Sequence, residues 1–239
     1  MAKWKVTSNR FVAFLDIMGF QNLVFRNTHK HVLALMEEIY HSLSVFEDEY
    51  KSRRGACVRP VLFSDSILLI SNDNSENSLD EIVFSTEWVI GSAFKRGLPI
   101  KGAIALGQQT ADFNRSLHFG RPLIDAYNLQ NELSFYGVVL HDSVERKHDA
   151  ATFESALLRR YKTPLKNGQV NHWVLDWRRI VTPKKESKNA YAAMLQSEKN
   201  FPLLALENIY KTVSGAARLY VDNTIEYIKW LDELHPVKK

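Results

Sequence analysis

Two aspartates stand at comparable places in the chain, and they are the residues best suited to chemistry. Asp16 ends a nearly all-apolar run that begins at Phe11, and Asp65 lies between two β-rich runs in 58–71. These runs predict a strand and a hairpin, with Asp65 at the hairpin tip. If the strands pair, two carboxylates meet over the backbone N–H groups of the bend at 17–20. That arrangement suits Mg²⁺ or Mn²⁺ carrying substrate phosphates.

A plainer interpretation competes with this one. An aspartate at a strand end is most often a turn former or a helix cap, and that holds for Asp16 or Asp65 taken alone. Both, however, are embedded in apolar strands of a single strand–helix–strand–strand unit. The two together therefore favour a shared cation site.

The elements that must position these carboxylates alternate between strands and helices. Helical spacing recurs in 29–50, 79–96, 123–135 and 153–161, and β-rich runs predict strands at 99–106, 138–140 and 171–176. This order predicts an α+β fold with one mixed sheet and helices packed against it. After the charged break at 183–187, amphipathic patterns in 203–213 and 216–234 predict two helices. We therefore expect a main domain at 1–182 and a C-terminal helical extension at 183–239, packed on the core or on a second subunit.

The composition excludes several classes of protein. The chain has 239 residues with 31 Lys and Arg against 27 Asp and Glu, too weak a positive charge for a dedicated nucleic-acid binder. Arginine pairs such as 159–160 and 178–179 are then interpreted as a solvated face. A single cysteine, Cys57, excludes a multi-cysteine metal site. No apolar run approaches the ~18 residues of a membrane span, and no signal-peptide core is present, so we expect a cytoplasmic protein without membrane or nucleic-acid partners.

Four segments resemble motifs of the class III nucleotide cyclases. Residues 14–23, FLDIMGFQNL, are similar to the family's first metal motif, F-x-D-I-x-G-F-x-x-L. Residues 61–68 resemble its second metal hairpin. The segments 98–107 and 119–126 are similar to its next strand and to the start of its catalytic helix. The segments occur in the family's order, and the resemblance covers about residues 8–180.

The resemblance implies a fold and a reaction. The family has a ferredoxin-like βαββαβ core and works as a head-to-tail homodimer with active sites between the subunits. Two aspartates there hold two divalent ions, which here implies Asp16, Asp65 and the carbonyl of Ile17 as ligands of Mn²⁺ or Mg²⁺. The 3′-hydroxyl of a nucleoside triphosphate attacks the α-phosphorus and pyrophosphate leaves, so a 3′,5′-cyclic monophosphate forms. Asp16 and Asp65 are thus also the expected catalytic residues.

Phosphate-binding residues are carried over in the same way. Met18, Gly19 and Phe20 would bind the phosphates of the substrate. Lys162 is the best match to the family's triphosphate lysine, although a solvated surface lysine is the competing interpretation of that residue.

The expected catalytic helix departs from the family pattern. The family's transition-state asparagine and arginine fall on Ile124 and Asn128. We keep Asn128 among the expected catalytic residues, but it lacks the positive charge of an arginine. Either turnover is slow or another cation substitutes, and Arg121 and Lys101 are the candidates.

The base pocket departs as well. Purine cyclases read the base edge with two polar residues, and these positions are Val61 and Leu117 here. Neither side chain can make a hydrogen bond to the base, which removes much of the discrimination for a purine. Phe63 and Phe119 instead predict a tighter apolar pocket in which a smaller base stacks.

These departures make the chain resemble the stand-alone pyrimidine cyclases of bacterial anti-phage signalling, the Pycsar type. The expected product is cyclic UMP from UTP or cyclic CMP from CTP, with UTP only slightly favoured. The product would act on a downstream cyclic-nucleotide effector. The alternative is a catalytically weak, cyclase-like protein that binds a nucleotide and signals through its helical tail.

Overall fold

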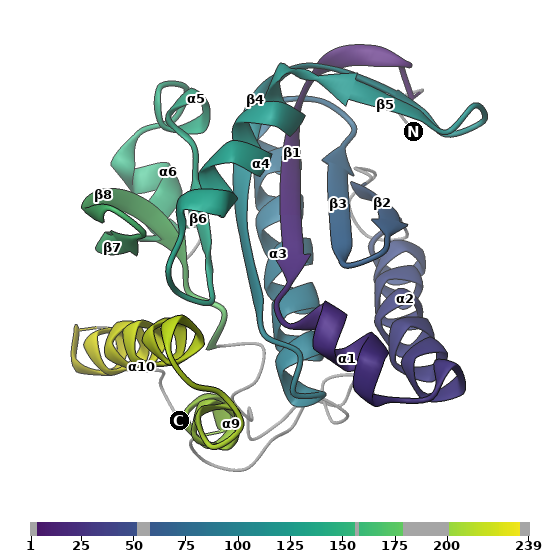
Figure 1. Cartoon of the computed structure of the whole chain (residues 1–239). Coiled ribbons are helices and arrows are strands. Elements are labelled where there is room, and N and C mark those ends of the chain that lie inside the picture. The colour runs from purple at the N-terminus through teal and green to yellow at the C-terminus, as the bar shows by residue number, and fades with distance from the viewer. Residues whose placement is uncertain (1–3, 52–57, 156–157, 179–200, 235–239) are drawn as a thin grey trace.

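The computed structural model describes residues 4–51, 58–155, 158–178 and 201–234 (Figure 1). Cys57, the charged break at 183–187 and the expected boundary between 182 and 183 lie outside the described residues. The elements are β1 (Thr7–Ile17), α1 (Phe20–Arg26), α2 (His29–Lys51), β2 (Val58–Phe63), β3 (Ser66–Ser71), α3 (Glu76–Lys95), β4 (Ile100–Asp112), β5 (Leu117–Gly120), α4 (Arg121–Glu132), β6 (Val138–Leu140), α5 (Asp142–Glu145), α6 (Ala150–Ser155), β7 (Leu158–Leu165), β8 (Gly168–Leu175), α9 (Phe201–Tyr210) and α10 (Ala216–Leu234).

The strands of the described residues form one eight-stranded mixed sheet. Its order is β2-β3-β1-β4-β6-β8-β7, and β5 pairs with the far part of β4. β1 lies between β3 and β4 and is antiparallel to both, whereas β4 and β6 run parallel. β1, which carries Asp16, and β3, which begins directly after Asp65, are therefore direct neighbours within the sheet (Figure 1).

Helices cover the two faces of the sheet unequally. Phe11, Ala13 and Leu15 point into the larger core, which includes buried residues of α2 and α3. Side chains alternate along a strand, so Phe14 and Asp16 face the opposite side, where the ring of Phe14 packs edge-on against Tyr127 of α4 at 5.2 Å. The acidic end of β1 thus lies on the face that α3 leaves uncovered.

Most expected elements are present, and two local predictions are wrong. The helix expected at 153–161 ends at Ser155, and β7 begins at Leu158. Leu158 is fully buried and pairs with Leu175, so the β7–β8 ladder decides the conformation there. The strand expected at 99–106 continues as β4 to Asp112, because the additional residues pair with the start of β1 and with β5.

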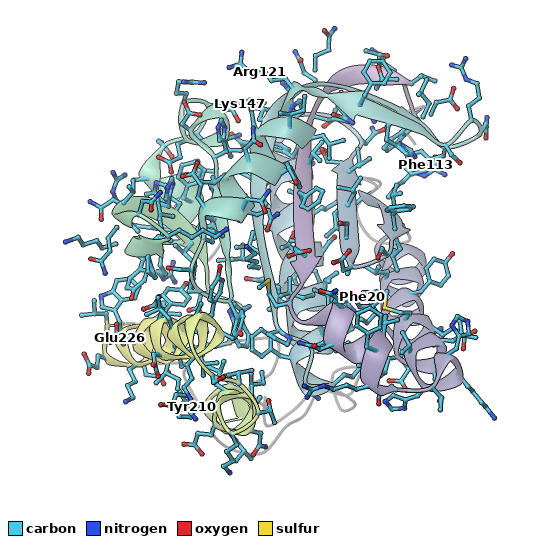
Figure 2. The ribbon with its side chains drawn as sticks, in the orientation of Figure 1. Phe20, Phe113, Arg121, Lys147, Tyr210 and Glu226 are labelled. Atoms are coloured by element: carbon cyan, nitrogen blue, oxygen red, sulfur yellow. The ribbon has the colours of Figure 1, made fainter. Side chains whose placement is uncertain are left out.

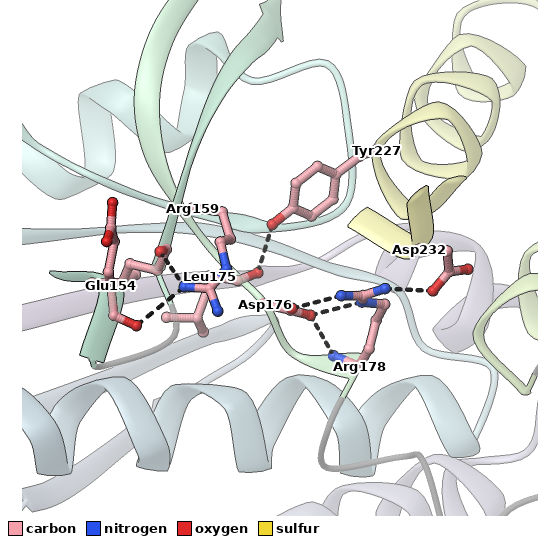
Figure 3. A network of polar contacts seen from close by, with 8 residues as sticks. Glu154, Arg159, Leu175, Asp176, Arg178, Tyr227 and Asp232 are labelled. Carbon is pink, nitrogen blue, oxygen red and sulfur yellow. Dashed lines mark hydrogen bonds and ion pairs between the residues drawn. The ribbon is translucent and has the colours of Figure 1, made fainter. Parts of the chain in front are cut away.

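The C-terminal helices are built into the main domain. Tyr227 of α10 is fully buried, and its hydroxyl donates a hydrogen bond to the carbonyl of Leu175 at 3.0 Å (Figure 3). Arg178 bonds Asp176 through two nitrogens, at 2.8 and 2.7 Å, and also pairs with Asp232 of α10. Arg178 is only 2% exposed, so the prediction that it belongs to a solvated basic face is wrong for this residue.

Among the described helices, none is both long enough and apolar enough to span a bilayer.

Candidate active site

The end of β1 and the tip of the β2–β3 hairpin meet. Asp16 is paired in register with Ser66, the first residue of β3. The N–H of Ile17 donates to the carbonyl of Asp65 at 2.9 Å. The structure therefore brings Asp16, Ile17 and Asp65 together at one end of the strands, as the sequence predicts; we call this place the acidic end of the sheet.

The electrostatic environment at the acidic end of the sheet favours a bound cation. Burial raises the pKa of Asp16 above its ordinary value, and the negative charge of Asp65 raises it further. The charge of Lys101 acts in the opposite direction but does not cancel these effects. Two carboxylates that repel each other, beside the backbone carbonyl of Ile17, are the kind of oxygen donors that Mg²⁺ and Mn²⁺ prefer.

The donor set within one chain is small. In the ranges that the structure describes, no group of three or more His, Cys, Asp and Glu side chains could hold a metal ion. A divalent ion at Asp16 and Asp65 would need further oxygen ligands, and substrate phosphates and water are the ones that Mg²⁺ sites normally use. The residues present thus fit an ion that binds together with a phosphorylated substrate.

The hairpin tip carries backbone strain beside Asp65. Ser64 has a φ of 54°, in the left-handed region that glycine adopts without penalty. Strained residues of this kind persist where the surrounding structure requires them, and Ser64 directly precedes Asp65 in this tip.

The bend after β1 offers fewer N–H groups than expected. Gly19 has a φ of 77° and no atom within 4 Å of an added Cβ, so its glycine serves backbone conformation. The N–H groups of Ile17 and Met18 are already donated, to Asp65 and to the carbonyl of Pro99 at 2.8 Å. Fewer N–H groups of the bend at 17–20 are therefore available to an anion than the sequence predicts. In the first turn of α1, the N–H groups that have no acceptor within the helix begin at Phe20.

Lys101 is the basic residue that the register of β1 and β4 places at the acidic end of the sheet. It pairs with Asp16 across the β1–β4 ladder and is 4% exposed. Burial, with a contribution from the charge of Lys166, lowers the pKa of Lys101 to about 8, while Asp16 opposes that shift. The next residue, Gly102, allows the strands to approach closely, because a Cβ there would lie 2.5 Å from the carbonyl oxygen of Phe14.

Arg121, the other candidate cation, lies at the opposite end of the sheet. Gly120, its neighbour, pairs with Gln109 on β4. Gln109 lies about eight residues beyond Lys101, or ~26 Å at ~3.3 Å per residue of strand. Figure 2 shows Arg121 far from Phe20, which follows the acidic end of β1. Within one chain, the structure therefore brings Lys101 and not Arg121 to Asp16.

The sequence predicts Lys162 as the triphosphate lysine and gives no role to Lys166. Lys162 is an exposed residue on β7, opposite Asn171. Lys166 occupies the β7–β8 turn, and its N–H donates to the carbonyl of Glu132 at 2.8 Å. The charge of Lys166 acts on Lys101, so Lys166 lies within electrostatic reach of the candidate site. A Lys-Asn-Gly turn between two strands is the signal that could have identified it.

The four expected base-pocket residues do not meet within one chain. Val61 and Phe63 lie on β2, and Phe63, 79% exposed, pairs with Ser66 beside the acidic tip. Phe119 is 55% exposed and pairs with Thr110.

β5 therefore carries Phe119 and Leu117 at the far end of the sheet, away from Phe63. Asn128 is exposed on α4, next to Tyr127. A pocket lined by Phe63 of β2 and Phe119 of β5 together would require a second copy of the chain.

Comparison with known proteins identifies the fold. No protein-family model matches the chain, and no curated protein matches it either. Among solved structures, one similar protein is the catalytic core of a rhodopsin-guanylyl cyclase with converted specificity, in complex with ATPαS. It is 15% identical with a TM-score of 0.53, and the match covers 70% of this chain and 94% of the chain of that cyclase core. The guanylate cyclase domain of RhGC from Catenaria anguillulae, in complex with GTP, is 16% identical with a TM-score of 0.52, covering 70% and 96%.

The chain has the class III cyclase fold. The expected fold class, a mixed-sheet α+β core with C-terminal helices, is thus confirmed. In this fold, Asp16, Asp65 and Lys101 lie together at the acidic end of the sheet. Phe119 and Arg121 lie at the opposite end of the strands.

Proposed function

We propose that the protein is a nucleotide cyclase, which converts a nucleoside triphosphate to a 3′,5′-cyclic monophosphate and pyrophosphate. The observation that carries this proposal is the convergence of Asp16 and Asp65 at neighbouring strand ends in a class III cyclase fold. A fold alone does not decide an activity, so the proposal rests on the chemistry of the residues at the acidic end of the sheet.

Each residue of the site has a role in this reaction. Asp16, Asp65 and the Ile17 carbonyl would hold two Mn²⁺ or Mg²⁺ ions, which would neutralise charge and activate the 3′-hydroxyl. Lys101, charged below pH of about 8, would bind the negative charge of the triphosphate. The 3′-oxygen forms a bond to the α-phosphorus and loses its proton as the bond to pyrophosphate breaks.

The substrate that we propose is a pyrimidine nucleotide, UTP or CTP, with UTP slightly favoured. Val61 and Leu117 offer no hydrogen bond to a purine edge, and the exposed rings of Phe63 and Phe119 can stack on a small base. The site we propose is shared by two chains in a head-to-tail homodimer, because Phe63 and Phe119 lie at opposite ends of one sheet.

The biological role that we propose follows from the resemblance of the sequence to stand-alone pyrimidine cyclases. Cyclic UMP or cyclic CMP would act as a second messenger in bacterial antiviral defence and would bind a downstream effector. Synthesis would take place in the cytoplasm, where nucleoside triphosphates are supplied, by the main domain at 1–182 with the extension from 183 onward packed on it.

Purified protein incubated separately with UTP, CTP, ATP and GTP in the presence of Mn²⁺ tests the proposal. Cyclic UMP or cyclic CMP is expected, with Asp16→Asn inactive and Asp80→Asn, at an exposed position on α3, fully active. Ready conversion of ATP or GTP without pyrimidine products would reject the substrate assignment. No cyclic product from any nucleotide would reject the activity.

A specific observation supports a second candidate function. Ile124 and Asn128 replace the two transition-state residues of the catalytic helix, which favours a protein that binds a nucleotide without turning it over. In that case nucleotide binding by calorimetry is retained while product stays absent. Any turnover that Asp16→Asn abolishes excludes this candidate.

A further inference from the structure

The C-terminal helix reaches the candidate site through one aromatic side chain. The Nζ of Lys101 lies 5.6 Å from the ring centroid of Tyr220 on α10. Tyr220 is also within electrostatic reach of Asp16, since burial and then the charge of Asp16 raise the pKa of its hydroxyl. Tyr220 thus lies beside the two residues that β1 and β4 bring together in register.

The position of Tyr220 is set by contacts of α10 with the core. Its ring packs against Tyr136, with 5.8 Å between centroids. One turn further along α10, the hydroxyl of Thr224 accepts a hydrogen bond from the N–H of Tyr136 at 2.8 Å. The side-chain amide of Asn223 donates to the carbonyl of Ser134 at 2.7 Å.

The segment that α10 holds is the one that pairs with β4 beside Lys101. The N–H of Gly102 donates to the carbonyl of Gly137 at 2.9 Å, and β6 continues from there. A short run of hydrogen-bonded backbone therefore links α10 to the strand that carries Lys101. A movement of α10 would shift Tyr220 and this segment together.

A lysine in this environment needs such support. Its flexible four-carbon stem allows many rotamers, and the charge of Lys166 repels the ammonium group that Asp16 attracts. An aromatic face within ~6 Å attracts an ammonium group most strongly where water is excluded. Lys101 is 4% exposed, which meets that condition.

We infer that Tyr220 is a positioning residue of the candidate site: its ring holds the Lys101 ammonium beside Asp16, which makes the C-terminal helix a working part of the site. This inference deepens the proposed function and rests on it for the role of Lys101. It adds a residue from an element that the cyclase motifs of the sequence do not include. Simple packing of Tyr220 on Tyr136 is the competing explanation.

Paramagnetic broadening by Mn²⁺ added together with pyrophosphate, which supplies the phosphate oxygens that the ion needs, tests the location without any enzyme activity. The protein is labelled with 3-fluorotyrosine, and the signals of Tyr220 and Tyr210 are assigned with the Y220F and Y210F variants. Tyr210 lies on α9 in the same helical hairpin and packs against Arg218, so it is the matched control (Figure 2). Mn²⁺ should broaden the Tyr220 signal first, and Asp16→Asn should remove that effect. Equal broadening of both signals, or none at Tyr220, overturns the inference.

Substitution tests whether the ring acts through Lys101. Tyr220→Leu should lower kcat, or the affinity for UTP with Mn²⁺, by about 10-fold, while Tyr220→Phe keeps the ring and should stay within about 2-fold of the wild type. Tyr210→Leu should have no effect. In a Lys101→Met background, Tyr220→Leu should have no further effect, because the partner of the ring is gone.

The outcomes separate this inference from the proposed function. If the wild type binds UTP without forming a cyclic product, the proposed function fails, and the calorimetric affinities of the same variants still test Tyr220. If the wild type is active but Tyr220→Leu is unchanged, the inference alone fails. A loss in Tyr220→Phe equal to that in Tyr220→Leu, or a further loss in the Lys101→Met background, also overturns it, since the ring would not act through the lysine.

Discussion

At the scale of single residues, Asp16 shows how a side chain of the candidate site can lower stability. Burial and the charge of Asp65 raise its pKa, so the folded state binds this proton more tightly than the unfolded state does. The ionised carboxylate therefore disfavours folding at neutral pH, and the effect disappears as the pH falls below the pKa of the unfolded chain. A divalent cation would relieve the same repulsion.

Asp16→Asn should raise the melting temperature of the metal-free protein at pH 7 and lower the proposed cyclase activity by at least about 100-fold. The gain in stability should shrink as the pH falls towards about 4, where the wild-type carboxyl also becomes neutral. Differential scanning fluorimetry over this pH range, with and without Mn²⁺, measures both effects. Asp80→Asn serves as the control, and a lower melting temperature for Asp16→Asn would contradict the account.

At the scale of elements, the close approach of β1 and β4 keeps Asp16 and Lys101 in register. Gly102→Ala should destabilise the protein by about 1–3 kcal/mol, because the added Cβ would lie 2.5 Å from the carbonyl oxygen of Phe14. Gly107→Ala is the comparison on the same strand, since its Cβ would come no closer than 3.1 Å to Pro122. Urea unfolding measures the difference, and equal losses in the two variants would argue against a special constraint at Gly102.

The start of α3 depends on a carboxylate in the loop before it. Asp73 accepts hydrogen bonds from the N–H of Ser75 at 2.9 Å and from the hydroxyls of Ser75 and Ser78, both at 2.7 Å. Burial alone would raise the pKa of Asp73, but these hydrogen bonds outweigh it and lower the pKa. The stabilisation is therefore present above pH ~4 and is lost as the pH falls through the lowered value.

Asp73→Ala should accordingly lower the free energy of unfolding by about 1 kcal/mol at pH 7 and by less at pH 3. Denaturant titrations at the two values compare the variant with the wild type. Asp80→Ala, an exposed position on the same helix, should change little at either pH. A loss for Asp73→Ala that is independent of pH would show that the carboxylate charge is not responsible.

At the scale of the whole molecule, the two halves of the proposed site lie at opposite ends of one sheet. Asp16 and Asp65 mark one end, whereas Phe119 and the start of α4 mark the other. In the head-to-tail homodimer that we propose, the acidic end of one chain would meet α4 of its partner, and two equivalent sites would form. Exposed apolar side chains such as Phe63 and Ile124, 79% and 59% accessible, are available for that contact.

Mixed dimers test the shared site directly. Asp16→Asn and Asn128→Ala should each be impaired alone, but an equimolar refolded mixture should regain about a quarter of the wild-type activity, because half of the dimers carry one intact site. The control mixture, Asp16→Asn with Asp65→Asn, should stay inactive, since both residues come from the same chain at each site. Equal recovery in the two mixtures would reject the head-to-tail arrangement.

The sequence alone determined the elements whose pattern is local. The apolar run ending at Asp16 and the short turn around Asp65 specify a strand end and a hairpin tip, because side-chain alternation and turn chemistry act over a few residues. Local patterns failed at 153–161, where the β7–β8 ladder overrode a helical spacing. They also missed the extension of β4, which only its partners β1 and β5 stabilise.

Only the tertiary structure decided which cations face the aspartates. Lys101 and Arg121 are equally basic in the sequence, yet the β1–β4 register brings one to Asp16 and the β4–β5 pairing carries the other to the far end of the sheet. Lys166 and Tyr220 likewise come from a distant turn and from the C-terminal helix. Their positions depend on which strands pair and how α10 packs, and no short stretch of sequence contains that information.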